Sequence, residues 1–291
     1  MIRIKKAVLP VAGFGTRFLP ATKAIPKEML TIIDKPLIEY AVEEAISAGA
    51  EEIIFITSHT KPSIKKHFSE APELEKRLKD SGKLDLLKKI KPEIFKNIKF
   101  TYINQAEQKG LGHAILLAEN AVGDDAFSVL LPDDLFLSTP TCLQQILDSY
   151  SKNLQSVIAV NKIDKENIHK YGVIDQGNNK LDESNTVTIS DIVEKPIAAD
   201  APSDIAVVGR YIFNPSIFNC IKQVEADGSG EIQITDAIKL LIQTENVQAK
   251  IFEGDKYDCG SKEGYLEATI AVAMKEPGLS DKIKKTITDK L

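Results

Sequence analysis

The chain has 291 residues, a length that suits one large domain or two small ones. Its residues are 43% apolar and 27% charged, a globular mixture that excludes disordered and fibrous proteins. The 37 Lys and Arg residues are outnumbered by 42 Asp and Glu, giving a formal net charge of −5. We therefore expect no general nucleic-acid binding, and any anionic ligand must be held by a local group of cations.

The elements follow an α/β pattern, in which short β-rich runs alternate with amphipathic helical stretches. The first predicted strand covers Lys6–Ala12, and a helix is predicted over Pro36–Ala48 with Gly49 as its C-cap glycine. Further strands are predicted at Glu52–Thr57, Phe100–Asn104, Phe127–Leu131, Ser156–Val160, Thr186–Val193, Ala206–Phe213 and Gln248–Glu253.

Helices are expected outside this alternation as well. The charged segment at 72–91 predicts one or two surface helices inserted between strands, and Ser261–Lys275 predicts a helix near the C-terminus. The charged tail from Ser280 is expected to fray. Because no repeat, linker or change of composition marks a boundary, we expect a single domain over 1–291.

The cysteines and the apolar runs bear on the compartment. Cys142, Cys220 and Cys259 lie far apart without a CxxC pair, which speaks against a structural zinc site and a disulfide framework. No apolar run approaches the roughly 20 residues of a membrane span. The run at 7–12 is too short for a signal peptide. We therefore expect no membrane partner and a reducing cytoplasm.

A glycine turn follows the first predicted strand, with Ala12, Gly13 and Gly15 in it. Glycine permits positive φ and close backbone approach, and its N–H groups can cradle phosphate. A P-loop would need Gly-Lys-Ser/Thr, whereas a threonine and Arg17 follow Gly15. A dinucleotide fingerprint would need a third glycine, where Phe18 stands, and an acid at the end of the second strand. Taken alone, the two glycines favour an ordinary tight turn over a phosphate-binding loop.

The cations beside this turn favour a ligand. Arg17, Lys23 and Lys27 fall within positions 17–27, among prolines that restrict the backbone. Arg can bind phosphate through two hydrogen bonds and Lys can act as a mobile point charge. A loop that meets a polyanion is therefore preferred over a solvated basic loop.

The string at 13–29, GFGTRFLPATKAIPKEM, resembles the signature of nucleotidyltransferases that make nucleotide sugars, and the resemblance runs from about position 6 to about 266. It implies a Rossmann-like three-layer α/β/α fold around a mixed, mostly parallel sheet. It also implies Mg²⁺-assisted direct attack of glucose 1-phosphate on the α-phosphorus of UTP, yielding UDP-glucose and pyrophosphate. Ala12, Gly13 and Gly15 would then lie along the nucleotide, with Arg17 facing the leaving pyrophosphate and Lys27 the attacked phosphate.

A second string is similar to the base-binding segment of that family. Gln105 ends the third predicted strand, and Gly110 opens the run Gly-Leu-Gly-His-Ala. The Gln105 amide offers both a donor and an acceptor, as a pyrimidine edge requires. Gly110 would let a flat base lie against the backbone. A lone His113 near a helix start is typically structural, so we assign it only an orienting or phosphate-adjacent role.

Two acidic positions are expected to concern the metal. Asp133 and Asp134 follow a predicted strand, where α/β proteins bind ligands, although an N-cap or turn pair is an equal alternative there. Mg²⁺ is bound by one or two carboxylates together with phosphate oxygens. The resemblance selects Asp133 as a metal ligand and leaves Asp134 to support the loop. Asp258 resembles the second acid near the metal, and Cys259 beside it is expected to be a packed residue.

The sugar phosphate is expected to meet Gly172, Glu194 and Lys195. The strings YGVI at 171–174 and VEKP at 193–196 resemble the sugar-phosphate site of the family. Glu194 would accept hydrogen bonds from sugar hydroxyls, Lys195 would neutralise the phosphate, and Gly172 would donate its N–H. An exposed salt bridge is the ordinary alternative for such a Glu-Lys pair. The string at 231–238 also resembles the family, with Thr235 or Asp236 expected as a helix N-cap.

Three other functions remain to be weighed. A thymidylyltransferase acting on the same sugar phosphate would show the same strings, because thymine and uracil share the edge that Gln105 would meet. A dehydrogenase with NAD is disfavoured by the missing third glycine, and a non-catalytic sensor of nucleotide sugars by the full set of charged groups. The family resemblance also implies a homo-oligomer, a dimer or tetramer, with the C-terminal helical segment at about 261–291 as a contact.

Overall fold

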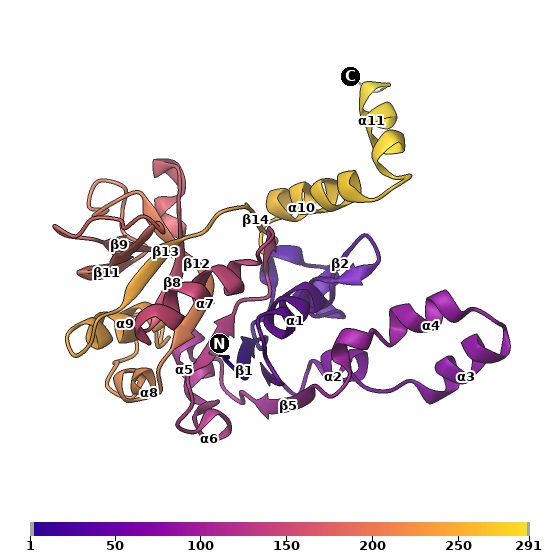
Figure 1. Ribbon diagram of the computed structural model, residues 1–291, viewed down its shortest axis with the longest axis horizontal. Coiled ribbons are helices and arrows are strands. Elements are labelled where there is room, and N and C mark those ends of the chain that lie inside the picture. The colour runs from indigo at the N-terminus through magenta and orange to yellow at the C-terminus, as the bar shows by residue number, and fades with distance from the viewer. Residues whose placement is uncertain (1–2, 290–291) are drawn as a thin grey trace.

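A ten-stranded sheet forms the centre of the computed structural model, which describes residues 3–289 (Figure 1). Its main path has the order β10-β13-β8-β12-β6-β1-β4-β5. The strands of this path are β1 (Lys6–Pro10), β4 (Glu52–Thr57), β5 (Lys99–Asn104), β6 (Phe127–Leu130), β8 (Val157–Lys162), β10 (Thr186–Thr188), β12 (Ile205–Phe213) and β13 (Gln248–Ile251). Off the path, β9 (Gly172–Asp175) pairs with β11 (Asp191–Glu194) and with β12.

Most strands of the main path point the same way. The pairs β5-β4, β4-β1, β1-β6 and β8-β13 are parallel, while β12 runs antiparallel to both β6 and β8. β10 is antiparallel to β13 at the edge. The predicted mixed, mostly parallel sheet is therefore confirmed.

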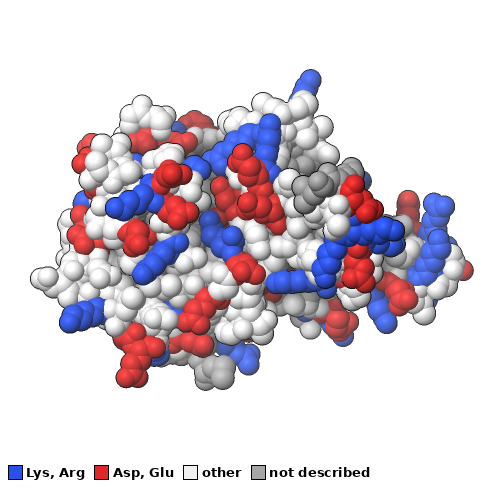
Figure 2. Space-filling model, turned by 90° about the horizontal axis from the view of Figure 1, so that it is seen from above, with Lys and Arg blue, Asp and Glu red and all other residues white. Residues whose placement is uncertain are grey.

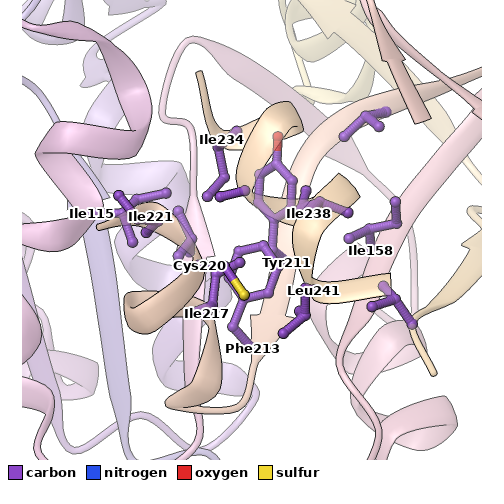
Figure 3. Packing of buried hydrophobic residues seen from close by; sticks show 14 of the residues in the cluster. Ile115, Ile158, Tyr211, Phe213, Ile217, Cys220, Ile221, Ile234, Ile238 and Leu241 are labelled. Atoms are coloured by element: carbon purple, nitrogen blue, oxygen red, sulfur yellow. The ribbon is translucent and has the colours of Figure 1, made fainter. Parts of the chain in front are cut away.

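Helices cover both faces of the sheet. One face carries α1 (Leu37–Ser47), α2 (Pro62–His67) and α7 (Cys142–Asn153), and the other carries α5 (Gly110–Leu116), α6 (Glu119–Val122), α8 (Ser216–Ile221) and α9 (Ile234–Ile242). Side chains alternate along a strand, so Leu9 packs in the first layer and Val8 in the second. Figure 3 shows Tyr211 and Phe213 of β12 beside apolar residues of α8 and α9. The three-layer α/β/α fold is confirmed.

Smaller elements complete the chain. Two helices, α3 (Pro72–Asp80) and α4 (Leu84–Ile90), occupy the predicted insertion and project beyond α2 in Figure 1. A short hairpin is formed by β2 (Thr31–Ile32) and β3 (Lys35–Pro36). Two strands far apart in the chain, β7 (Asp134–Leu137) and β14 (Asp255–Asp258), form a separate antiparallel pair. Short 3-10 helices lie at η1 (Thr16–Phe18), η2 (Ala21–Lys23), η3 (Lys27–Met29), η4 (Glu93–Phe95) and η5 (Lys165–Lys170).

Several sequence predictions need correction. β1 ends at Pro10, because the chain then turns toward the glycines. The strand predicted over Thr186–Val193 is two strands, β10 and β11, which pair with different partners. The expected frayed tail is also wrong as far as the structure describes it, because α11 (Ser280–Thr288) is helical and contacts α10 (Lys262–Lys275). Leu279, Ile283 and Ile287 recur every fourth residue there, which favours a helix over fraying.

Helix α9 starts differently from the prediction. Its N-cap is Gln233, so Thr235 and Asp236 lie inside the first turn and neither caps the helix. The Thr235 hydroxyl instead donates a hydrogen bond to Glu194 Oε2 at 2.7 Å. The helix was therefore predicted in the right place, but its N-cap lies two or three residues before the predicted positions.

No helix between residues 3 and 289 combines the length and the apolar character that crossing a bilayer requires.

A buried ion pair fixes the segment after β6. Arg210 of β12, 1% exposed, contacts Glu44 of α1 through Nε and Nη2 at 3.0 and 2.9 Å. Its guanidinium also donates to the carbonyls of Leu131 at 2.7 Å and Asp134 at 2.9 Å. Arg210 therefore ties together the two ends of the turn that contains Asp133.

Arg210→Met is expected to lower the free energy of unfolding by about 3–5 kcal/mol, because it leaves the Glu44 carboxylate buried without its partner. Urea denaturation followed by circular dichroism measures the loss. Lys89→Met serves as a control, since the Lys89–Asp34 pair is 65% exposed on both sides and its loss should leave the midpoint unchanged. If Arg210→Met unfolded at the same urea concentration as the unmodified protein, the buried Arg210–Glu44 pair would not stabilise the fold as proposed.

Candidate active site

The site residues converge because the strands that precede them are parallel. β1, β4, β5 and β6 are neighbours that point the same way, so the loops after their carboxyl ends meet at one edge of the sheet. The glycine turn follows β1, Lys61 follows β4, Gln105 follows β5 and Asp133 follows β6. This edge is where open α/β sheets bind their ligands.

The glycine turn is built for close approach. Gly15 has φ +66°, and a Cβ there would lie 3.0 Å from Lys27 Cβ, so glycine is required. The Thr22 hydroxyl donates to the Gly15 carbonyl at 2.7 Å and holds the turn against η2. A Cβ at Gly13 would meet nothing within 4 Å, so this part of the turn faces open space. Ala12, by contrast, is buried.

A buried lysine supports the turn from behind, and sequence reasoning missed it. Lys61 Nζ donates to the carbonyls of Val11 at 2.7 Å and Gly13 at 2.6 Å. It also contacts both oxygens of Glu28 in η3, at 3.1 and 2.9 Å. Nothing local distinguishes Lys61 from the other lysines of its segment, so no sequence signal would have found it.

Lys27 and Asp133 form an ion pair between the loop after β1 and the loop after β6. Lys27 Nζ lies 2.6 Å from Asp133 Oδ2, and the two side chains are 24% and 27% exposed. Burial opposes the charged form of Lys27, but the charges of Asp133 and Glu28 outweigh it and raise the pKa of Lys27. Burial likewise opposes ionisation of Asp133, yet Lys27 and Arg17 lower the pKa of that carboxyl. Both groups are therefore charged at neutral pH.

Asp258 reaches the same place through a long-range pairing of two strands that sequence reasoning missed. β14 pairs antiparallel with β7, with Asp258 opposite Asp134. Gly260 marks the point of convergence, since a Cβ there would lie 2.9 Å from Asp258 Oδ1, 3.2 Å from Asp133 Oδ2 and 3.2 Å from Arg17 Nη1. Arg17 also donates to the Gly260 carbonyl at 3.2 Å.

Two carboxylates near one point fit a divalent metal that completes its shell with phosphate oxygens. Asp133 Oδ2 and Asp258 Oδ1 flank the space over Gly260, where any side chain would intrude. Within residues 3–289, no group of three or more His, Cys, Asp or Glu side chains could hold a metal by itself. Two carboxylates are a donor set that a divalent cation can bind together with phosphate oxygens.

Asp134, which was expected to support the loop, contacts a lysine and not the space over Gly260. Its carboxylate pairs with Lys256 Nζ at 2.7 Å, with both side chains largely buried. Lys256 also lies 4.9 Å from the centre of the Tyr171 ring, which precedes Gly172. Lys256, another residue that the sequence did not reveal, thus connects the Asp133 loop to the strand that carries Gly172.

Gln105 and His113 contact each other at the end of β5. Gln105 is 4% exposed, and its amide nitrogen lies 3.0 Å from His113 Nδ1. Burial and Lys109 lower the pKa of His113, so its neutral ring accepts this hydrogen bond. The contact agrees with an orienting role for His113. The amide of Gln108, which was not singled out, donates to the Ala12 carbonyl at 2.7 Å.

Gly110 has a packing reason to be glycine. It has φ +87°, and a Cβ there would lie 2.8 Å from the Ile232 carbonyl. The backbone of residues 109–112 is hydrogen-bonded to Ile232 at both ends, through Lys109 O and Gly112 N. Close backbone approach by another part of the chain, and not by a base alone, therefore explains this glycine.

The predicted sugar-phosphate residues lie together. Gly172 of β9 is the pairing partner of Glu194 of β11, and Glu194 Oε2 accepts from Thr235 at 2.7 Å. Lys195 Nζ lies 3.0 Å from Glu194 Oε1, with the lysine side chain 54% exposed. Lys195 has φ +43°, a left-handed conformation at the sharp exit from β11. The pair has the geometry of a salt bridge whose cation still reaches solvent.

Cys259 is packed and not nucleophilic. It is 3% exposed, and burial raises its pKa to about 12.

Charges of both signs are interspersed over the face in Figure 2, without a large area of one sign.

The chain is similar to known nucleotidyltransferases over nearly its full length. A family model described as nucleotidyl transferase matches residues 6–275. A UTP–glucose-1-phosphate uridylyltransferase of Bacillus subtilis (strain 168) is 44% identical over 283 residues, covering 97% of this chain and 96% of the relative. A UTP-bound UGPase from Acinetobacter baumannii superposes with a TM-score of 0.90 at 40% identity, covering 98% and 99% of the two chains. A UDP-glucose pyrophosphorylase complexed with UDP-glucose superposes with a TM-score of 0.84 at 43% identity, and the match covers 94% of this chain and 100% of that chain.

Proposed function

The chain belongs to the nucleotidyl transferase family, and we propose on that basis that it makes UDP-glucose and pyrophosphate from UTP and glucose 1-phosphate. The observation that carries the proposal is the convergence of Arg17, Lys27, Asp133 and Asp258 around one point at the carboxyl edge of the sheet. Similarity to uridylyltransferases over 97% of the chain supports UTP as the nucleotide.

The reaction needs no nucleophile from the protein. A phosphate monoester dianion can attack the α-phosphorus of the triphosphate directly, with departure of pyrophosphate. The obstacles are the repulsion between two polyanions and the charge that develops on the leaving group, so positioning and electrostatics carry the catalysis. Arg17 holds the departing pyrophosphate, Lys27 stabilises charge at the attacked phosphate, and Lys195 anchors the sugar phosphate.

A divalent metal belongs to this chemistry in the family, and we infer that here it is Mg²⁺ held by Asp133 and Asp258. When bound, it neutralises phosphate charge and brings the two substrates' phosphates together. The two carboxylates leave positions for phosphate oxygens, which supports this assignment. A metal held through Asp133 Oδ2 would compete with the Lys27 ammonium, which contacts that oxygen.

The remaining residues are assigned to the two substrates. The turn at Ala12, Gly13 and Gly15 follows the nucleotide, with Gln105 and Gly110 beside the base. The open space over Gly13 supports the first assignment, since backbone N–H groups there can reach a phosphate. Gly172 and Glu194 bind the sugar, and the hydrogen bond from Thr235 orients the Glu194 carboxylate.

A coupled assay of pyrophosphate release tests the proposal. UTP and dTTP, with CTP and ATP for comparison, are each paired with glucose 1-phosphate and galactose 1-phosphate in the presence of Mg²⁺. UTP with glucose 1-phosphate is expected to give the highest kcat/KM. A higher value with dTTP would favour a thymidylyltransferase, and no release with any pair would leave a sensor of nucleotide sugars.

Glu194→Gln is expected to raise the KM for glucose 1-phosphate by roughly tenfold, since hydrogen bonds to a charged carboxylate are worth about 1.5–3 kcal/mol. The KM for UTP should stay the same. Asp191→Asn on the same strand is the control, because Asp191 pairs with exposed Lys239 at 3.0 Å. Equal effects on both KM values would indicate general loosening of β11.

We infer a homo-oligomer, a dimer or tetramer, as the working form. Support comes from apolar side chains on α10 and α11 that remain open to solvent: Leu266, Ile270 and Ile287 are 60%, 39% and 44% exposed. Light scattering gives the molar mass that tests it.

We also propose a single nucleotidyltransferase domain over 1–291 with a helical insertion at about 72–91. The ten-stranded sheet supports it, since its strands come from Lys6 through Ile251. The cytoplasm is the proposed location, supported by Cys142, Cys220 and Cys259, all of which are free and buried.

A further inference from the structure

Lys61 is a buried cation outside the groups that were assigned to the substrates. It lies at the start of α2, only 7% exposed, although lysine is among the residues least often buried. Its ammonium group has four acceptors within 3.1 Å, namely the carbonyls of Val11 and Gly13 and both oxygens of Glu28. An ammonium has only three protons to donate, so this environment is saturated.

The four contacts join two separate parts of the site. Val11 and Gly13 belong to the segment that leads from β1 into the glycine turn, and Glu28 belongs to η3, next to Lys27. Glu28 is 1% exposed, and no contact with another cation within 4.0 Å is recorded for it in the described part of the chain. One ammonium group therefore connects the start of the turn to the loop that carries Lys27.

We propose that Lys61 is a positioning residue for nucleotide binding, which fixes the backbone of the glycine turn against the loop that carries Lys27. The inference rests on the proposed function, because it takes the turn at Gly13 to be the nucleotide site. Lys61 reaches no substrate itself. It binds the carbonyls of Val11 and Gly13, while the proposed function assigns the N–H groups of the turn to phosphate.

If Lys61 had a purely structural role, it would only neutralise Glu28, and UTP affinity would follow stability. The single variant Lys61→Met leaves Glu28 unpaired and is expected to lose stability under either reading. The double variant Lys61→Met with Glu28→Met removes both charges and replaces the pair with apolar side chains of similar size. Such replacements of buried pairs are often neutral, so most of the lost stability should return.

The experiment measures UTP binding to the full-length protein by calorimetry, without glucose 1-phosphate, together with urea denaturation. In the double variant we expect recovered stability but a dissociation constant for UTP about tenfold higher than in the unmodified protein. The KM for glucose 1-phosphate should stay within about twofold. Recovery of UTP affinity together with stability would overturn the proposal, and so would an equal rise in both constants.

Lys250→Met is the matched control. Lys250 is also a buried lysine, 8% exposed, and its ammonium donates to the Ser184 carbonyl at 2.7 Å, beside β13 and away from the glycine turn. Its loss should reduce stability without changing UTP affinity. Failure of the unmodified protein to bind UTP at all would count against the proposed function, whereas normal UTP binding in the double variant would count against Lys61 alone.

Discussion

Asp133→Asn is expected to lower kcat by about 10²–10³-fold at saturating UTP, glucose 1-phosphate and Mg²⁺, the scale for loss of one preorganised electrostatic group. The reason is that the substitution removes the carboxylate charge that flanks the space over Gly260 with Asp258. Asparagine keeps the size of the side chain and one oxygen, so the fold should persist. The rate of pyrophosphate release with both substrates saturating measures the effect.

A second readout separates a metal ligand from a general electrostatic role. Mn²⁺ binding, followed by electron paramagnetic resonance without substrates, should weaken in Asp133→Asn. Asp255→Asn is the control, because Asp255 lies at the exposed start of β14, three residues before Asp258. Unchanged turnover and unchanged Mn²⁺ affinity in Asp133→Asn would show that the metal assignment is wrong.

That Arg17, Lys27 and Asp133 lie close together could be predicted from the sequence, because they belong to short local segments. Arg17 and Lys27 lie in the loop that follows β1, and Asp133 follows β6, the parallel neighbour of β1. Parallel neighbours place such loops at one edge whatever the details of packing. The sheet itself was predictable for the same reason, since buried parallel strands are nearly continuous apolar runs.

Residues that depend on long-range pairing were beyond sequence reasoning. Asp258 was suggested by resemblance alone, because its place beside Asp133 depends on the pairing of β14 with β7, two strands of four residues each. Lys61 and Lys256 look like surface lysines in the sequence, and only the fold buries them. Whether a lysine is buried depends on the tertiary structure, so no local sequence pattern predicts it.

One functionally placed glycine was predicted from the sequence and another was missed. Gly15 was singled out for a tight turn, and its positive φ and the nearness of Lys27 confirm that glycine is required there. Gly209 was overlooked, although it has φ +78° and a Cβ there would lie 2.7 Å from Asp134 Oδ2. It lies where the register of β12 shifts, so a bulge in the strand accommodates the Asp134 loop.

Lys27→Ala is expected to lower kcat on the same scale as Asp133→Asn, by about 10²–10³-fold, because it removes the cation that meets the charge developing at the attacked phosphate. Lys35→Ala is a matched control. The Lys35–Glu43 pair is 2.7 Å long and 31% and 30% exposed, close to the 2.6 Å, 24% and 27% of Lys27–Asp133, but lies apart from the carboxylates at Gly260. Its loss should leave kcat unchanged.

The two variants should separate in Mn²⁺ affinity although both slow turnover. Without substrates, Lys27 Nζ occupies Asp133 Oδ2, and the metal competes with that ammonium for the carboxylate. Lys27→Ala removes the competitor, so Mn²⁺ binding to the free protein should become tighter, while Asp133→Asn weakens it. Weaker Mn²⁺ binding in Lys27→Ala would mean that Lys27 holds Asp133 in place for the metal, and its direct role at the phosphate would then have to be abandoned.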